Sequence, residues 1–195
     1  MNEHLSEIVC IVDRSGSMDA IRTDAIGGFN TFLADQKQEP GNARLSLVLF
    51  NHEYKLVYDN VKIDEVRPLE EKTYVPQGMT ALLDAVGRTI DAVGERLSRT
   101  PEPERPAKVI VAILTDGLEN ASKDYSRGKV AEMIQHQREK YSWEFIFLAA
   151  NQDAIASARS ISIDAEDAIA FQATGAGVRH AHMQMSQEIA RRRRS

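Results

Sequence analysis

Apolar runs and amphipathic segments alternate along the chain. Residues 8–12 and 108–114 are apolar runs whose length and β-branched content are typical of strands buried on both faces. Further apolar segments predict strands over residues 44–50, 54–60, 143–150 and 167–172. Apolar residues at helical spacing, together with a possible Asn151 cap, predict helices over residues 20–38, 80–97, 126–140, 151–160 and 177–194.

The order of these elements indicates the architecture. The link over residues 51–53 is too short for a crossover, so the strands on either side of it pair as an antiparallel hairpin. Strands and helices alternate elsewhere, which favours parallel pairing with helices on both faces. We therefore expect a three-layer, doubly wound, Rossmann-like α/β sheet, mostly parallel with one antiparallel edge strand and helices on both faces.

The chain length fits one ordinary domain. Its 195 residues can bury a sizeable core, so we assign a single domain over residues 1–195, with a core of about 6–190. Residues 191–195 form a basic end, which we expect to be a solvated, partly disordered tail. Gly27 and Gly28 interrupt the first helix at a cost of about 1 kcal/mol each, which predicts close packing against a strand.

Carboxylate and hydroxyl side chains follow the first buried strand. Asp13 stands where this strand is expected to end, and Ser15 and Ser17 lie in the turn that leads to the helix. From such a turn, side chains at alternate positions can converge above the sheet edge. Oxygen ligands of this kind suit a hard cation such as Mg²⁺ or Mn²⁺. The alternative is that Asp13 or Ser17 caps the next helix, which explains one residue of the three.

Two more oxygen donors are expected at the same edge of the sheet. Asp116 follows the strand over residues 108–114, and Thr80 begins the helix over residues 80–97. Sites in open α/β sheets gather outside the carboxyl ends of the strands. The hydroxyls would then offer neutral oxygens, while the two carboxylates supply the charge, directly or through water. The sequence therefore predicts a divalent metal site made by Asp13, Ser15, Ser17, Thr80 and Asp116.

These residues resemble a known site. Asp13-x-Ser15-x-Ser17, Thr80 and Asp116 are similar, in type and order, to the metal-ion-dependent adhesion site (MIDAS) of the von Willebrand factor type A (VWA) domain. The resemblance covers nearly the whole chain, and all five positions are filled. It implies an ion, Mg²⁺ (or Mn²⁺ or Ca²⁺), held mostly by neutral ligands, with one position open to an Asp or Glu carboxylate of a partner protein.

The resemblance also implies a cellular setting. Bacterial cytoplasmic proteins of this type work beside chaperone-like ATPases or in stress-response gene clusters, tellurium resistance among them. The net charge of −5 gives no reason to expect a nucleic-acid or membrane partner. Residues 1–7 lack the basic and apolar regions of a secretory signal, and Cys10 has no second cysteine to pair with. We expect a cytoplasmic protein.

The sequence lacks the motifs of the enzymes that compete with this metal-dependent binding module. A haloacid-dehalogenase-type phosphatase needs a second acid where Ser15 stands. A phosphate-binding P-loop and a Gly-x-Ser-x-Gly motif are missing from the sequence, and no His lies near Ser15 or Ser17 to act as a base. We therefore expect no enzyme. A metal-dependent phosphohydrolase and a metal-independent scaffold stay as the alternatives.

Four other residues lie beside the candidate site in the sequence. Glu119 and Asn120 follow Asp116, and we expect them to be solvated loop residues. The alternative is that they shape the rim or touch a ligand. Met18 and Met79 flank the expected ion. They fit a partner-facing rim and packing in the core equally well.

Overall fold

The computed structural model describes residues 1–150 and 153–195. The expected helix cap, Asn151, lies outside these residues. The helix that it was expected to begin is short and starts at Ala154.

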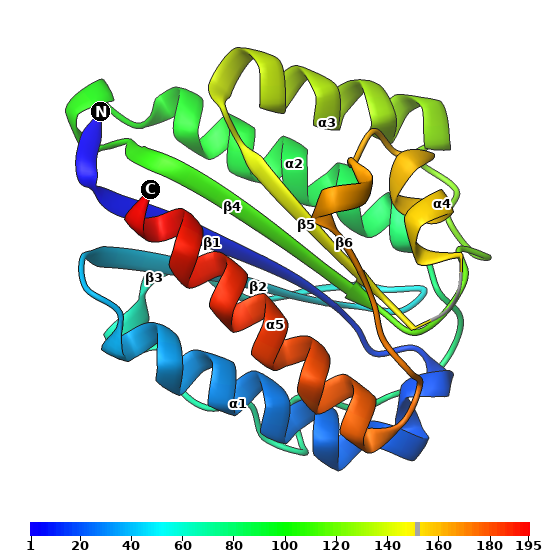
Figure 1. The fold of residues 1–195 in the computed structure, drawn as a ribbon. Coiled ribbons are helices and arrows are strands. Elements are labelled where there is room, and N and C mark those ends of the chain that lie inside the picture. Colours follow the sequence, from blue (N-terminus) through cyan, green and yellow to red (C-terminus); the bar gives the residue numbers. More distant parts are fainter. Residues whose placement is uncertain (151–152) are drawn as a thin grey trace.

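Within the described residues, six strands form one sheet in the order β3-β2-β1-β4-β5-β6 (Figure 1). Neighbouring strands are parallel except β3, which pairs antiparallel with β2 through the predicted hairpin. The strands are β1 (Asn2–Asp13), β2 (Asn42–Phe50), β3 (Tyr54–Lys62), β4 (Pro106–Thr115), β5 (Glu144–Ala149) and β6 (Ala168–Ala170). The predicted fold class is confirmed.

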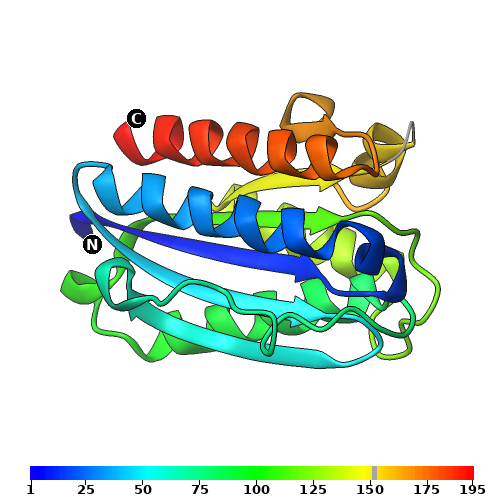
Figure 2. The same cartoon turned by 90° about the horizontal axis from the view of Figure 1, so that it is seen from below.

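Helices cover both faces of the sheet. In Figure 2, α1 and α5 lie side by side along one face, while α2, α3 and α4 pack on the other face (Figure 1). The helices are α1 (Arg22–Gln38), α2 (Leu82–Arg99), α3 (Arg127–Tyr141), α4 (Ala154–Arg159) and α5 (Gly175–Arg194). Short 3₁₀ helices span Gly16–Ile21, Ile63–Glu65, Glu102–Glu104 and Ala165–Asp167. In the described part of the chain, no helix is both long and apolar enough to cross a membrane.

The continuous apolar run of β1 is explained by these two layers of helices. Ile8, Cys10 and Val12 face the core under α1 and α5. Val9 and Ile11, which alternate with them, face the core under α2 and α3. Because a strand points successive side chains to opposite faces, a strand between two helical layers must be apolar at every position.

Two helix starts differ from the prediction. A 3₁₀ helix precedes α1, which begins at Arg22 rather than near residue 20. The helix α2 begins at Leu82 rather than at Thr80. The backbone N–H of Ala81 donates to the carbonyl of Asn51, and Asn120 binds the backbone of Thr80. These tertiary hydrogen bonds hold the residues before Leu82 outside the helix.

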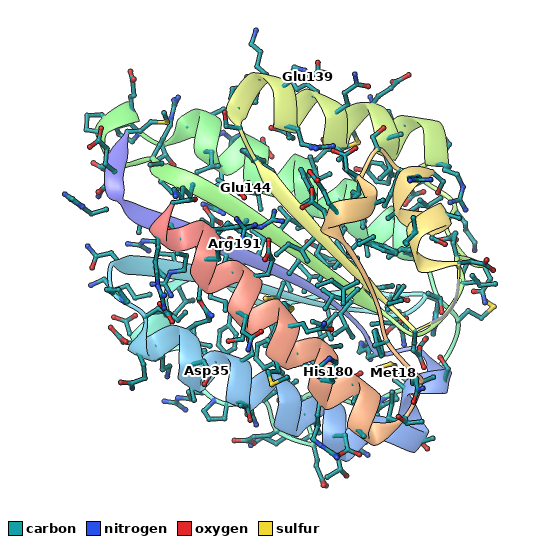
Figure 3. The ribbon with its side chains drawn as sticks, viewed as in Figure 1. Met18, Asp35, Glu139, Glu144, His180 and Arg191 are labelled. Atoms are coloured by element: carbon teal, nitrogen blue, oxygen red, sulfur yellow. The ribbon has the colours of Figure 1, made fainter. Side chains whose placement is uncertain are left out.

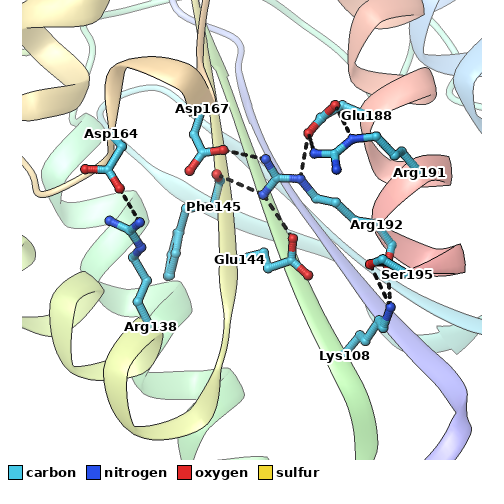
Figure 4. Close-up of polar contacts among 10 residues, drawn as sticks. All are labelled: Lys108, Arg138, Glu144, Phe145, Asp164, Asp167, Glu188, Arg191, Arg192 and Ser195. Atoms are coloured by element: carbon cyan, nitrogen blue, oxygen red, sulfur yellow. Dashed lines mark hydrogen bonds and ion pairs between the residues drawn. The ribbon is translucent and has the colours of Figure 1, made fainter.

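The basic end of the chain is not a solvated tail, so that prediction is wrong. The helix α5 runs through Arg194, and the side chain of Arg192 is buried. Its guanidinium lies among the carboxylates of Glu144, Asp167 and Glu188 (Figure 4). We call these four residues the Arg192 cluster. The cluster ties the end of α5 to the start of β5, at the opposite end of the molecule from Met18 (Figure 3).

Gly28 of α1 packs against a helix, not against the predicted strand. A Cβ atom on Gly28 would lie 2.7 Å from Nδ1 of His182, on α5. No atom lies within 4 Å of a Cβ built on Gly27. The close approach of α1 to α5 therefore depends on Gly28 alone of the two.

His182 is buried in this helix–helix contact as a neutral ring. Its Nδ1 lies 2.9 Å from the carbonyl oxygen of Val178, and its Nε2 has no hydrogen-bond partner among the described residues. Burial lowers the pKa of His182 to about 4, although the hydrogen bond to Val178 opposes the shift. Protonation of the ring would place an unpaired charge between α1 and α5.

We expect this histidine to make the fold less stable in acid. The folded pKa lies below the unfolded value, so its contribution is complete above pH 6.5 and is lost as the pH falls. Between pH 7.5 and pH 5, His182 is expected to lower the free energy of unfolding of the native chain by about 2 kcal/mol. Urea unfolding at both pH values should show a smaller loss in His182→Leu. Equal losses in the two proteins would exclude His182 as the source.

Candidate metal centre

The candidate site begins at the carboxyl ends of the neighbouring strands β1 and β4. Asp13 ends β1, and its carboxylate is buried. Its Oδ1 accepts a hydrogen bond from the backbone N–H of Ser15 at 2.6 Å. Its Oδ2 accepts one from the hydroxyl of Thr115, the last residue of β4, also at 2.6 Å. The two strand ends are therefore joined through the Asp13 side chain.

The two serines continue from Asp13 toward Asp116. The Oγ atoms of Ser15 and Ser17 lie 3.2 Å apart. Ser17 donates its hydroxyl proton to Oδ1 of Asp116 at 2.7 Å. This chain of contacts places two carboxylates and two hydroxyls side by side, although Asp116 is 99 positions away from Ser17 in the sequence.

Thr80 reaches the same place from the segment just before α2. A Cβ atom built on Gly117 would lie 3.0 Å from Oγ1 of Thr80. The same point is 3.7 Å from the Oγ of Ser17 and 3.8 Å from that of Ser15. Three hydroxyl oxygens thus surround a small space that any larger residue at position 117 would fill. The structure brings together all five residues predicted from the sequence.

Without a cation, the surroundings of the site disfavour the ionised forms of Asp13 and Asp116. Burial raises the pKa of Asp13, and the nearby Asp116 carboxylate raises it further, while hydrogen bonds from Thr115 and Ser15 oppose the shift. Burial also raises the pKa of Asp116, against a hydrogen bond from Ser17. Among the ion pairs of the described residues, none involves either carboxylate. The nearest arginine in sequence, Arg14, pairs with Glu53 instead.

The donor set fits a hard divalent cation. Two carboxylates and three hydroxyls offer only oxygen, which Mg²⁺, Mn²⁺ and Ca²⁺ prefer. Within the described residues, no group of three or more His, Cys, Asp or Glu side chains is placed to hold a metal. Because three of the five donors are hydroxyls, an ion among these residues would be held largely by neutral oxygens. A cation there would offset the charges of the buried Asp13 and the partly buried Asp116.

Glu119 and Asn120 remain partly exposed and exposed, respectively, but both hold the rim in place through hydrogen bonds, so their role is to shape the rim rather than loop solvation alone. Oδ1 of Asn120 accepts from the backbone N–H of Thr80 at 2.9 Å, and its own N–H donates to the carbonyl of Thr80 at 3.0 Å. The carboxylate of Glu119 accepts from the backbone N–H groups of Leu83, Ala121 and Ser122. These bonds lock the loop after β4 to the start of α2.

Two more residues position the loops of the site: Tyr74, which was not predicted from the sequence, and Asp84, which the sequence places near the site as a solvated or supporting residue. Tyr74 donates its hydroxyl proton to the carbonyl of Asp13 at 2.6 Å, and it is fully buried. Asp84 on α2 accepts from the backbone N–H groups of residues 123–125. Their partners are far away in the sequence, and no local pattern marks either contact.

The two methionines beside the site have different environments. Met18 is fully buried under α1, so it packs in the core. Met79 has 56% of its surface exposed beside Thr80. Of the two methionines, only Met79 is therefore placed to form part of a partner-facing rim.

The comparisons with known proteins bear on the fold. No protein-family model matches the chain, and no curated protein matches its sequence. Among solved structures, proximal thread matrix protein 1 (PTMP1) from the mussel byssus has a TM-score of 0.63 at 15% identity, over 95% of this chain and 46% of that chain. This chain thus spans just under half of the mussel protein. The structure of PTMP1 with a zinc-occupied MIDAS motif has a TM-score of 0.61 at 16% identity, and the match covers 97% of this chain and 46% of that chain.

A second similar protein matches this chain over nearly the whole length of both chains. It is the vWF domain of the type V pili tip protein Mfa5 from Porphyromonas gingivalis. Its TM-score is 0.66 at 11% identity, and the match covers 97% of this chain and 96% of that chain. At these identities the likeness is one of fold. The chain has the fold of a von Willebrand factor type A domain.

Proposed function

We propose that this protein is a divalent-metal-dependent protein-binding module. Asp13, Ser15, Ser17, Thr80 and Asp116 would hold Mg²⁺, or Mn²⁺ or Ca²⁺ in its place. The observation that carries the proposal is the meeting of three hydroxyl oxygens at Gly117. Beside them lie the buried carboxylate of Asp13 and the partly buried carboxylate of Asp116, neither with an ion-pair partner among the described residues. When bound, the ion supplies a positive charge that attracts an Asp or Glu carboxylate of a partner protein.

The residues of the site favour binding over catalysis. The hydroxyls of Ser15 and Ser17 contact each other and Asp116. A nucleophilic serine needs a base within hydrogen-bond reach, and no histidine hydrogen-bonds to either hydroxyl in the described part of the chain. The VWA-like neighbours support the same view, because they include a byssus matrix protein and a pilus tip protein.

A paramagnetic ion tests the proposal directly. Chelator-stripped protein is loaded with Mn²⁺, and the relaxation rate of water protons is measured while acetate or the neutral acetamide is added. We expect binding to the protein to increase the relaxation rate that Mn²⁺ causes. Added acetate should then lower this rate, because its carboxylate displaces water from the ion, whereas acetamide should not. Asp116→Ala should abolish both effects.

The control for this experiment is Asp19→Ala, which removes an exposed acid from the turn beside the site. It should behave as the native chain. A bound ion that does not respond to acetate would contradict carboxylate recognition, and no bound ion at all would contradict the metal site itself.

A further inference from the structure

Two large apolar side chains are exposed next to predicted metal ligands in the sequence. Met79 precedes the predicted ligand Thr80 and is 56% exposed. Leu118 is two residues after Asp116 and is 62% exposed. Both side chains are therefore accessible to a partner that binds at the candidate metal centre. We call Met79 and Leu118 the apolar rim.

A cavity opens beside Leu118. Its volume is about 200 Å³, and it lies between the loop after β4 and the helix α4. Gly117 and Leu118 line the end near the metal centre, while the rest of the apolar lining comes from Leu82, Leu83, Phe147, Ala149 and Ile161. Gly117 also borders the three hydroxyls. The cavity therefore begins one residue away from the predicted ligands.

The two charged side chains that line this cavity, Glu119 and Arg127, have hydrogen-bond partners. The carboxylate of Glu119 accepts hydrogen bonds from backbone and hydroxyl donors of the same loop and of α2. The guanidinium of Arg127 donates to the hydroxyl of Ser160. An incoming group thus meets mainly the apolar lining, which favours an apolar occupant.

The cavity is large enough for one side chain. An apolar cavity of about 150 Å³ can bind benzene, so a cavity of 200 Å³ admits a side chain the size of leucine or phenylalanine. The net charge of −5 also matters. Because an acidic protein does not attract an acidic partner over long distances, contacts at short range must supply affinity beyond the ion itself.

We propose that the partner presents its carboxylate next to a bulky apolar side chain, which enters the cavity beside Leu118 and contacts the apolar rim. The proposal rests on the metal-dependent function proposed above. It narrows the partner to a segment in which Asp or Glu neighbours a residue such as Leu, Met or Phe. A carboxylate among polar neighbours would bind more weakly.

Small carboxylic acids test this without the natural partner. The Mg²⁺-loaded chain, labelled with ¹³C at its methionine methyl groups, is titrated with acetate and with 4-methylpentanoate. The exposed Met79 methyl reports binding, and the buried Met18 methyl is the internal reference. Each buried methylene is expected to improve affinity about fourfold, so 4-methylpentanoate should bind at least about tenfold more tightly than acetate.

Leu118→Ser should remove most of this gain and leave the affinity for acetate unchanged. The matched control is Leu56→Ser, which changes an exposed leucine on β3. Equal affinity of the two acids for the native protein would overturn the inference. The proposed function would still stand in that case, because acetate binds. The same gain for the neutral 4-methylpentanol with Mg²⁺ removed would also overturn it. If neither acid binds the Mg²⁺-loaded chain, the proposed function fails first.

Discussion

Replacing Arg192 with alanine is expected to lower the free energy of unfolding by about 3–5 kcal/mol. Arg192 is 5% exposed, and its Nη2 lies 2.5 Å from Asp167, its Nε 3.0 Å from Glu188 and its Nη1 3.3 Å from Glu144. Removing one cation leaves these partly buried carboxylates to repel one another. Equilibrium unfolding in urea, followed by circular dichroism, measures the loss.

The neighbouring arginine provides the control. Arg191 is on the same turn of α5 and pairs with Glu188, but its side chain is 66% exposed. Surface ion pairs contribute about 0–1 kcal/mol, so Arg191→Ala should stay within that range. Adding Glu144→Gln and Asp167→Asn to Arg192→Met should recover part of the loss, because the unpaired charges are gone. Similar losses for Arg191→Ala and Arg192→Ala would contradict the role of burial.

The second large effect is expected at Asp116, and its sign depends on the metal. In chelator, Asp116→Asn should raise the free energy of unfolding by about 1 kcal/mol, because one of two neighbouring carboxylates is neutralised. In Mg²⁺ at a hundredfold excess over Kd, the native chain should gain about 2.7 kcal/mol, and the variant should gain none. The variant is thus more stable than the native chain without metal and less stable with it.

Thermal and urea unfolding in the two buffers measure this reversal. Asp19→Asn, the exposed acid of the neighbouring turn, should respond to Mg²⁺ as the native chain does. An equal response of Asp116→Asn and native protein would show that Asp116 does not hold the ion. A loss of stability in chelator would show that its hydrogen bond with Ser17 outweighs the repulsion from Asp13.

The parts of the molecule that follow local rules could be predicted from the sequence. The run of β1 is apolar at every position because both faces are covered, and a three-residue link admits only a hairpin. The strand ends then placed Asp13 and Asp116 at one edge, since the carboxyl ends of parallel strands meet there. The five candidate residues followed from that geometry and from their similarity to a known motif.

The parts that depend on distant contacts could not be predicted. Asn120 binds the backbone of Thr80, 40 positions away, and nothing in the local pattern marks that pairing. Arg192 looks like one of four solvated arginines in the sequence. Because β6 pairs with β5 only from Phe147 onward, the carbonyl of Phe145 is left to accept from Arg192. This contact depends on the register of β5 and β6, and the charge run does not reveal it.

Titration of Mg²⁺ into the chelator-stripped chain, by calorimetry, tests the central claim most directly. We predict saturable binding of one ion per chain, lost in both Asp116→Asn and Thr80→Val, with an increase in Tm that follows the same saturation. Thr80→Val removes the hydroxyl near Gly117 and keeps the shape of the side chain. No heat and no change in Tm for the native chain would mean that the five residues only build the turn between β1, α2 and β4.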